Sequence, residues 1–557
     1  MSMNGADIAV KALEANGVKV VFGYPGASNA PFVDSVSRSS IDYVLTRNEQ
    51  GAAHMASGYG RVNHVAGVCT ATSGPGATNL ITAIATAYMD SIPMVAITGQ
   101  VKRELIGKDA FQEVDIIGAT LPFTKHSYLV KDVSDIPRIV DEAFHIATTG
   151  RPGPVLIDFP LGVLTDEYDD EVGKREINLR GYKLVGKANE SQIKKVADAL
   201  RKAKKPIILA GGGVCCSEAV DEVRKFVELT NIPVVSTMMG LGVVPTDSDS
   251  YYGMIGSHGK KCANVLLNRS DFILALGTRL GDRSIANIKG LEKVKKLVHV
   301  DIDPAEIGKN TLPKIPVVGD IKDVTEQLIN VVGDYRTSSE WIDEAHELRN
   351  ETSRVQVSED TGFVNPKYFL ERLSAITNSE IYLTTEVGQN QIWSANHYTI
   401  KKPDHFLTSG GFGTMGYGLP AAIGASCAQR DLPVVAIMGD GSFQMDMVEL
   451  GTMKQYGIPV KMVLFKNDRL GMVHELQYLN YNSNFQMVDI TGGPDFCKLA
   501  EAYGIRTGEI SENSEIDGAI ADMLSDDKSY FLVVNVNPFE PTGDAYNENA
   551  LNTKKEA

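Results

Sequence analysis

The sequence lacks several features that define particular classes of protein. Its six cysteines include no Cys-x-x-Cys pair, so they are predicted to be reduced core thiols, not a disulfide framework or a zinc site. No apolar run reaches the roughly 18 residues of a membrane span. The start, MSMNGADIAVKALEANG, lacks the basic and then apolar pattern of a targeting peptide. These absences predict a cytoplasmic protein without a membrane partner.

Basic residues are also not in excess. The 557 residues include 54 Lys and Arg against 70 Asp and Glu, a net charge of -16. Nucleic acids and anionic membranes select basic protein faces, so neither is expected as a partner. A few local arginines can still bind small anionic substrates.

What is present is a regular alternation of strand-like and helical segments. Apolar runs end in Gly, Asp or Pro, as in KPIILAGGG and PVVAIMGDG, and helical patterns lie between them. This order predicts an α/β fold of parallel sheets, with ligands at the carboxyl ends of strands. The chain is too long for one core. Polar stretches at 165–191 and 335–366 are predicted linkers, which gives domains at 1–170, 190–335 and 365–557.

The first and third domains share a pattern. In each, a strand leads to a glycine turn, a helix, the dipeptide Ile-Pro and another strand. Gly74 and Pro93 are 19 positions apart, and Gly439 and Pro459 are 20 apart. We interpret this as a duplicated fold, of which one copy acquired Asp440.

Asp440 and Asn467 form a candidate metal site. Each follows a predicted strand, and 27 positions separate them. If the strands are neighbours, the two side chains offer hard oxygen ligands, which Mg²⁺ prefers together with phosphate and water. The alternative is a helix N-cap and an ordinary turn, and the spacing favours the metal.

This pair resembles the signature of the thiamine-diphosphate enzymes. Further motifs are similar to those of the acetohydroxyacid synthase (acetolactate synthase) large-subunit family: FGYPG, EQGAAHMASGYGR, TSGPGATN, DAFQE, GRPGPVLIDFP, HVDIDPAEIGKN, LTSGGFGTMGYGLPAAIGA and GDGSFQM. The resemblance covers nearly the whole chain. It implies three doubly wound parallel-sheet domains: a pyrimidine-binding domain, a central FAD-type domain and a diphosphate-binding domain.

The resemblance also implies an activity, cofactors and partners. The family decarboxylates pyruvate and joins the product to a second 2-keto acid, which gives acetolactate or acetohydroxybutyrate for branched-chain amino-acid biosynthesis. The implied cofactors are thiamine diphosphate, Mg²⁺ and FAD. The implied assembly is a homodimer or homotetramer with active sites at the subunit interface, and a small regulatory subunit is a further partner.

Site residues follow from the resemblance by position. Glu49 would hydrogen-bond the aminopyrimidine ring, although it could instead be only a dipole partner of its helix. Asp440, Asn467 and the backbone of Arg469 would bind Mg²⁺. Substrates would meet Gln112, Arg283, Phe111, Ala27 and Leu476. Thiamine diphosphate would contact Gln389, Asn390, Ser409, Gly411, Met415, Gly441, Ser442 and Met472. FAD would contact Arg151, Gly212, Gly213, Thr237, His258, Arg279, Asp301, Asp303 and Asp320.

Several positions depart from the family pattern. Ala27 and Ser28 replace Gly and Ala, Asn48 and Asn390 replace His, and Leu476 replaces Trp. RLGDR replaces RFDDR, and KND replaces a pair of asparagines. These changes leave two alternatives open: a related 2-keto acid decarboxylase or lyase, and a non-catalytic nucleotide-binding regulatory protein. For Leu476 we expect near-equal use of pyruvate and 2-ketobutyrate as acceptors, unless it is a core residue.

Overall fold

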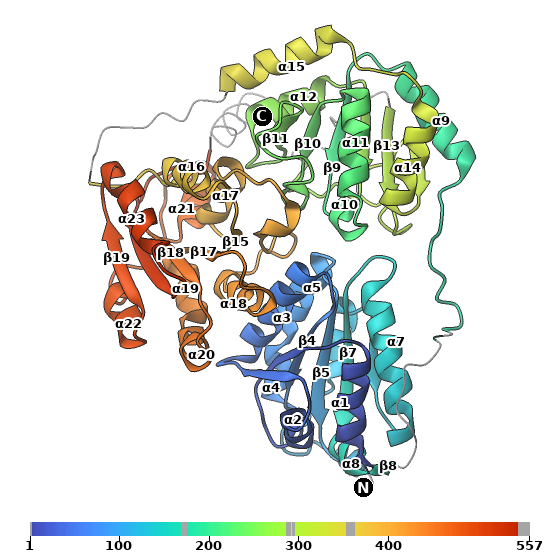
Figure 1. The fold of residues 1–557 in the computed structure, drawn as a ribbon, viewed down its shortest axis with the longest axis vertical. Coiled ribbons are helices and arrows are strands. Elements are labelled where there is room, and N and C mark those ends of the chain that lie inside the picture. The colour runs from blue at the N-terminus through green and yellow to red at the C-terminus, as the bar shows by residue number, and fades with distance from the viewer. Residues whose placement is uncertain are drawn as a thin grey trace.

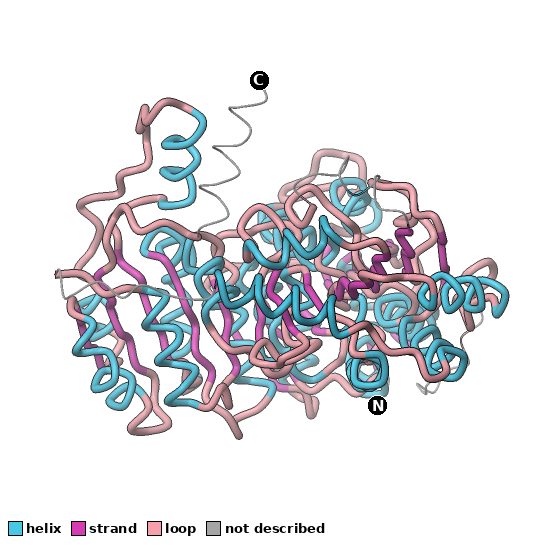
Figure 2. Tube along the Cα trace, turned by 90° about the horizontal axis from the view of Figure 1, so that it is seen from above, coloured by secondary structure: helices cyan, strands magenta, loops and turns pink. Residues whose placement is uncertain are grey.

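The computed structural model describes residues 3–168, 177, 179–285, 291, 296–352 and 362–543. In this part of the chain, three six-stranded parallel sheets define three α/β domains (Figure 1). Strands run between layers of helices when the molecule is seen from above (Figure 2). The predicted fold class is confirmed. Over the same residues, no helix is both long and apolar enough to cross a membrane.

The first domain contains a sheet of strand order β3-β2-β4-β5-β7-β6. A short antiparallel pair of strands, β1 and β8, brings together the start and the end of the domain's chain. The strands are β1 (Met3–Asn4), β2 (Val20–Gly23), β3 (Asp42–Leu45), β4 (Gly67–Ala71), β5 (Met94–Gln100), β6 (His126–Leu129), β7 (Pro154–Pro160) and β8 (Glu167–Tyr168). The helices are α1 (Gly5–Ala15), α2 (Ala30–Ser37), α3 (Glu49–Asn63), α4 (Pro75–Asn79), α5 (Ile81–Met89), α6 (Ile116–Thr120), α7 (Ile136–Thr148) and α8 (Leu161–Thr165).

The central domain has strand order β11-β10-β9-β12-β13-β14. Numbered along the chain this is 3-2-1-4-5-6, the order of dinucleotide-binding sheets. Its strands are β9 (Pro206–Ala210), β10 (Val234–Ser236), β11 (Tyr251–Met254), β12 (Phe272–Leu276), β13 (Lys296–Asp301) and β14 (Ile315–Val318). Its helices are α9 (Glu190–Arg201), α10 (Gly213–Cys216), α11 (Val220–Thr230), α12 (Lys261–Arg269), α14 (Ile321–Val332) and α15 (Ser339–Thr352).

The third domain has strand order β16-β15-β17-β18-β20-β19. Its strands are β15 (Tyr382–Thr385), β16 (Phe406–Leu407), β17 (Val434–Gly439), β18 (Lys461–Lys466), β19 (Arg506–Ile510) and β20 (Tyr530–Asn535). Its helices are α16 (Pro366–Thr377), α17 (Gln389–His397), α18 (Gly418–Ala428), α19 (Asp440–Asp446), α20 (Leu450–Tyr456), α21 (Gly471–Asn480), α22 (Phe496–Ala502) and α23 (Ile516–Met523).

The first and third sheets have the same topology. When the six strands of each sheet are numbered along the chain, the strand order of both sheets is 2-1-3-4-6-5. Gly74 precedes α4 and Gly439 precedes α19, so Pro75 and Asp440 occupy equivalent positions. This agrees with the predicted duplication of the fold.

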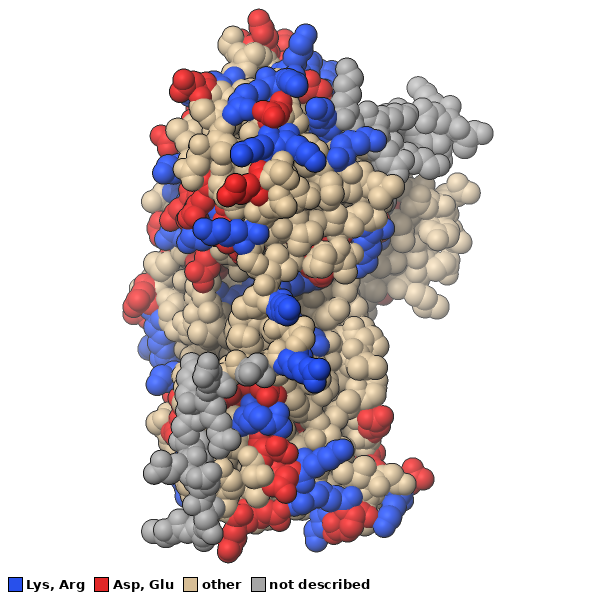
Figure 3. Space-filling view, turned by 90° about the vertical axis from the view of Figure 1, so that its right-hand side faces the viewer, with Lys and Arg blue, Asp and Glu red and all other residues tan. Residues whose placement is uncertain are grey.

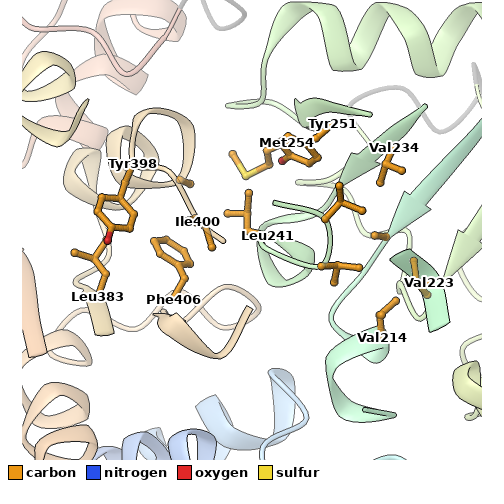
Figure 4. Close-up of a cluster of buried hydrophobic side chains, with 14 of the residues drawn as sticks. Val214, Val223, Val234, Leu241, Tyr251, Met254, Leu383, Tyr398, Ile400 and Phe406 are labelled. Carbon is orange, nitrogen blue, oxygen red and sulfur yellow. The ribbon is translucent and has the colours of Figure 1, made fainter. Parts of the chain in front are cut away.

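Packing joins the domains through small residues and apolar side chains. Helices α3 and α18 lie side by side, and a Cβ atom on Gly58 or Gly424 would overlap a backbone carbonyl oxygen of the facing helix. On the other side of the third domain, Leu241 faces Ile400 and Phe406 across the boundary with the central domain (Figure 4). The three sheets are therefore held in fixed relation around a common centre.

One predicted linker is partly built into a domain. Helix α15, inside the stretch 335–366, packs against α12. Trp341 on α15 is buried, and its indole N–H donates to Pro206 O at 2.8 Å. The polar composition of this stretch reflects the outer face of α15, and the helix is not part of a free linker. On the face drawn in Figure 3, acidic and basic side chains are interspersed toward the top and bottom, and uncharged residues cover most of the middle.

Candidate active site

Asp440 and Asn467 meet at the carboxyl ends of β17 and β18. These strands pair in parallel, with Gly439 opposite Phe465. The N–H groups of Asn467 and Asp468 donate to Asp440 Oδ2 at 3.1 and 2.6 Å. Burial raises the pKa of Asp440 to about 6, although these N–H groups lower it. A bound cation would stabilise this desolvated carboxylate.

The pocket around Asp440 contains most of the predicted diphosphate-binding residues. Its described lining includes Gln389, Asn390, Met415, Gly441, Ser442, Asn467, Arg469 and Met472. The Nδ2 group of Asn467 donates to Gln389 Oε1 at 3.0 Å. Asn390 Oδ1 is buried here without a hydrogen-bond partner among the residues that the structure describes. An unsatisfied buried acceptor in a pocket fits a site that receives a ligand.

Glu49 begins α3 in the first domain. Asn48 caps the helix by accepting the Gln50 N–H at 2.8 Å. The carboxylate of Glu49 accepts the Asn79 side-chain N–H at 2.9 Å, and so faces the turn before α5. Among the described residues, the lining of the Asp440 pocket contains none from the first domain. Within one chain, Glu49 does not share the pocket of the predicted metal ligands.

The predicted substrate residues are mostly exposed. Gln112 packs its backbone against the turn before α4, with its carbonyl oxygen 2.8 Å from the position of a Cβ on Gly74. Phe111 is 88% exposed. Ala27 is exposed, whereas its neighbour Ser28 is buried and bonded to Thr72 and Ser73.

Leu476 lies on the outer part of α21. Its side chain is 42% exposed, so it is not a core residue. Met472, one turn earlier on the same helix, lines the Asp440 pocket. Leu476 itself is not among the described residues that line this pocket, and its predicted role in acceptor choice stays a prediction.

A second cleft opens where the strand order of the central sheet reverses. Gly211 follows β9, Gly213 begins α10, and Gly277 follows the neighbouring strand β12. A Cβ on Gly213 would lie 2.6 Å from Gly277 Cα, so a side chain has no room there. Such a glycine turn lets a ligand approach the backbone closely. The strand order of the central sheet is that of dinucleotide-binding sheets, and two glycine turns lie at its point of reversal.

Most of the residues predicted to bind FAD surround this cleft. Its lining includes Arg151, Gly212, Gly213, Thr237, Arg279, Asp301 and also Arg283. Gly411, predicted for the diphosphate site, lies here with Gly410. Ser409 is buried beside them, and its Oγ accepts the Thr414 N–H at 3.0 Å. The structure thus groups Gly411 with the central cleft, not with Asp440.

Three further predicted residues have structural contacts of their own. Asp303 pairs with Arg151 at 3.3 Å. Asp320 caps α14 by accepting the Lys322 N–H at 2.9 Å. His258 lies near Thr542, at 3.5 Å, between the central and third domains. Burial lowers the pKa of His258 to about 4, so its ring is neutral at neutral pH.

Sequence reasoning missed several polar residues around these sites. Asn79 orients Glu49, and Glu475 accepts the Gln389 side-chain N–H at 2.7 Å. A buried group of carboxyls, Glu386, Asp446 and Glu449, lies between the first and third domains. Glu449 accepts the N–H groups of Arg47 and Asn48 just before Glu49. The sequence gave no sign that these carboxyls are buried, because charged side chains usually lie on the surface.

Comparison with known proteins assigns each domain to one family. The description "Thiamine pyrophosphate enzyme, N-terminal TPP binding domain" matches residues 3–119, the central domain of that family matches 193–328, and its C-terminal TPP binding domain matches 386–535. The fold and the Asp440 pocket thus define a thiamine-diphosphate enzyme.

Full-length relatives narrow the class. A probable acetolactate synthase large subunit of Methanococcus aeolicus is 44% identical over 554 residues, which cover 96% of this chain and 92% of that protein. One from Methanocaldococcus jannaschii is 43% identical, covering 97% and 93%. The acetolactate synthase isozyme 2 large subunit of Escherichia coli is 41% identical, covering 97% and 96%. The chain belongs to the acetolactate synthase large-subunit family.

Proposed function

We propose that this transferase decarboxylates pyruvate and joins the resulting two-carbon unit to a second 2-keto acid. The product would be acetolactate or acetohydroxybutyrate, for branched-chain amino-acid biosynthesis in the cytoplasm. The observation that carries the proposal is the pairing of Asp440 with Asn467 in a pocket that also contains Met415 and an unsatisfied Asn390. Membership of the family supports the choice of substrates.

Asp440, the side-chain oxygen of Asn467 and the backbone oxygen of Arg469 would hold Mg²⁺. In the structure, the Arg469 N–H donates to Asn467 Oδ1 at 3.1 Å, so these two residues already form one compact turn. Carboxylate and carbonyl oxygens suit Mg²⁺, which takes its other ligands from phosphate and water. The metal would neutralise the diphosphate and fix it beside β17 and β18.

Thiamine diphosphate, when bound, would supply a carbon nucleophile, formed by loss of a proton, and an electron sink for decarboxylation of the keto acid. Glu49 would hold a proton at the aminopyrimidine ring, and Asn79 would fix the direction of its carboxylate. Gln112 and Phe111 would border the reacting keto acid. Arg283 would bind the carboxylate of the second substrate through its planar guanidinium.

The active site would be completed by a second copy of the chain. Glu49 and the Asp440 pocket are separate within one chain, and each half lies near exposed apolar side chains. Phe111 is 88% exposed in the first domain, and Met445 and Val473 are 57% and 43% exposed in the third. Burial of such side chains between subunits would stabilise a dimer. A small regulatory subunit is a further expected partner, since the relatives are named large subunits.

FAD would occupy the central cleft without a redox role in the main reaction. The dinucleotide strand order and the glycine approach at Gly213 and Gly277 support this assignment. A purified yellow protein that releases FAD on denaturation is the expected result. A colourless protein that is fully active without added flavin would contradict it.

Two measurements test the proposed function. Incubation with pyruvate, thiamine diphosphate and Mg²⁺ should yield acetolactate, and acetaldehyde as the main product would instead identify a decarboxylase. Asp440→Ala should lose Mg²⁺-dependent retention of thiamine diphosphate because it removes the carboxylate that would hold the metal. Undiminished affinity with unchanged sensitivity to EDTA would refute the metal assignment.

A further inference from the structure

The segment 409–416 connects the two cofactor sites. Gly410 and Gly411 line the central cleft, and Met415, only four residues later, lines the pocket of Asp440. The segment is folded on itself by the hydrogen bond between Thr414 and Ser409. So short and closed a segment can transmit a displacement from one end to the other.

Asp90 of the first domain holds the cleft end of this segment. Its Oδ1 accepts the Gly411 N–H at 2.5 Å, and the residue is only 8% exposed. Arg279 of the central domain lies on the other side of Gly411. A Cβ there would be 2.6 Å from Asp90 Oδ1 and 2.7 Å from Arg279 Nη2. Residues of all three domains therefore meet at one glycine.

The pocket end is held equally firmly. Thr414 Oγ1 lies 2.6 Å from Thr86 Oγ1 in a buried contact with the first domain. The Gly416 N–H donates to Glu386 Oε2 at 2.7 Å. Met415 lies between these two anchors, so its position depends on that of the whole segment.

We propose that Asp90 is a positioning residue that couples the two cofactor sites through the segment 409–416. A dinucleotide beside Arg279 fixes Gly410 and Gly411 against Asp90, and Met415 is then held ready for the diphosphate cofactor. Each cofactor thus strengthens the binding of the other. This inference rests on the proposed binding of FAD and thiamine diphosphate, and it adds the route by which one site affects the other.

Calorimetric titration of the full-length apoprotein tests the coupling. The Kd of thiamine diphosphate with Mg²⁺ is measured with and without saturating FAD, and the Kd of FAD with and without thiamine diphosphate. For each cofactor, the ratio of its Kd without and with the other cofactor measures the coupling. Thermodynamic linkage requires the two ratios to be equal, and coupled sites typically show ratios of about 5 to 150. We expect a ratio in this range for the native chain.

Three variants assign the coupling to Asp90. Asp90→Ala removes the acceptor of the Gly411 N–H and should bring the ratio near unity. Asp90→Asn keeps an oxygen at that position and should retain most of the coupling. Asp158→Ala is the matched control, because Asp158 is a buried carboxyl of the same domain whose side chain bonds to Thr98 and Gln100. It should leave the ratio unchanged.

Hydrogen exchange of the native chain provides a measurement that needs no variant. FAD alone should slow the exchange of amides in the segment 410–416. No change there, equal Kd values with and without FAD, or full coupling in Asp90→Ala would each overturn the inference. Failure of the native chain to bind either cofactor at all would overturn the proposed function, and this inference with it.

Discussion

Asp446 is a carboxyl group in surroundings that oppose its charge. The residue is 3% exposed, and its Oδ2 atom has no hydrogen-bond partner among the described residues. Burial, with the nearby Glu386 and Glu449, raises the pKa of Asp446 to about 9. The group is therefore neutral in the folded protein at pH 7, whereas in the unfolded chain it ionises near pH 4.

This difference makes the stability of the native protein depend on pH. A carboxyl whose pKa is raised by folding makes its full contribution to stability only below the pKa of the unfolded state. The free energy of unfolding therefore falls as the pH rises from about 4 toward 9. Asp446→Asn keeps a neutral group of the same shape. We expect the variant to be more stable than the native chain by about 1 kcal/mol or more at pH 8, with a smaller difference at pH 5. Urea denaturation at several pH values measures it.

A control separates this effect from a change in net charge. Asp527 is exposed, so Asp527→Asn should alter stability little at any pH. If the advantage of Asp446→Asn were the same at pH 5 and pH 8, the ionisation of Asp446 would not be its cause.

Glu49 carries the second prediction at this scale. Glu49→Gln keeps the contact that the Asn79 side chain can make with an oxygen, but it removes the group that shares a proton. Thiamine diphosphate should still bind, while exchange of its C2 proton should slow by about 10²- to 10⁴-fold, as is typical of general acid–base groups. Quench-flow NMR of the bound cofactor gives the rate. A native rate in the variant would exclude Glu49 from this role.

At the scale of elements, the contact between α3 and α18 depends on small residues. A Cβ on Gly424 would overlap the carbonyl oxygen of Met55, and the backbones cannot separate without losing their packing. In an open helix, Gly→Ala would stabilise by about 0.5–1 kcal/mol. Gly424→Ala should instead destabilise the chain by about 1–3 kcal/mol through overpacking.

Gly518 provides the matched comparison for this prediction. It lies inside α23, where a Cβ would meet no atom within 4 Å. Gly518→Ala should therefore stabilise the chain, as alanine ordinarily does when it replaces glycine inside a helix. Thermal denaturation of both variants measures the contrast, and a stabilised Gly424→Ala would show that α3 and α18 are free to move apart.

The elements themselves were largely predictable where the strands are buried. The apolar runs that end in Gly, Asp or Pro became central strands such as β4, β5, β9 and β17, which are buried on both faces. Edge strands were harder, since β6 and β19 are short and partly exposed and carry no apolar run. Asp440 and Asn467 were brought together as expected because parallel neighbours end at one edge. Gly411 lines the central cleft and not the described lining of the Asp440 pocket, and its assignment to the diphosphate cofactor stays a prediction.

At the scale of the whole molecule, the separation of Glu49 from the Asp440 pocket predicts shared active sites. Glu49→Gln and Asp440→Ala should each be nearly inactive alone. A mixed dimer would contain one intact site, formed by the native Glu49 of one chain and the native Asp440 of the other. Refolding or co-expressing equal amounts should restore about a quarter of native activity, as statistical pairing in a two-fold dimer requires.

Assembly controls make this result decisive. A chain with both substitutions, mixed in equal amount with native protein, should inactivate both sites of every mixed dimer. The activity should therefore fall below that expected from simple dilution, to about a quarter of the activity of the same total amount of native chain. The size of the mixed species is measured by light scattering. No recovery of activity, despite mixed dimers, would place Glu49 and Asp440 in the same chain's site.

The matching 2-1-3-4-6-5 order of the first and third sheets has a consequence for ancestry. Two like folds that meet along α3 and α18 are what fusion of an ancestral symmetric pair would leave in one polypeptide. After such a fusion the halves no longer need to be alike, so one could specialise in the metal and the other in the proton. Pro75 and Asp440, which begin equivalent helices, are the positions at which such a difference between the two halves would be found if the proposed metal site is correct.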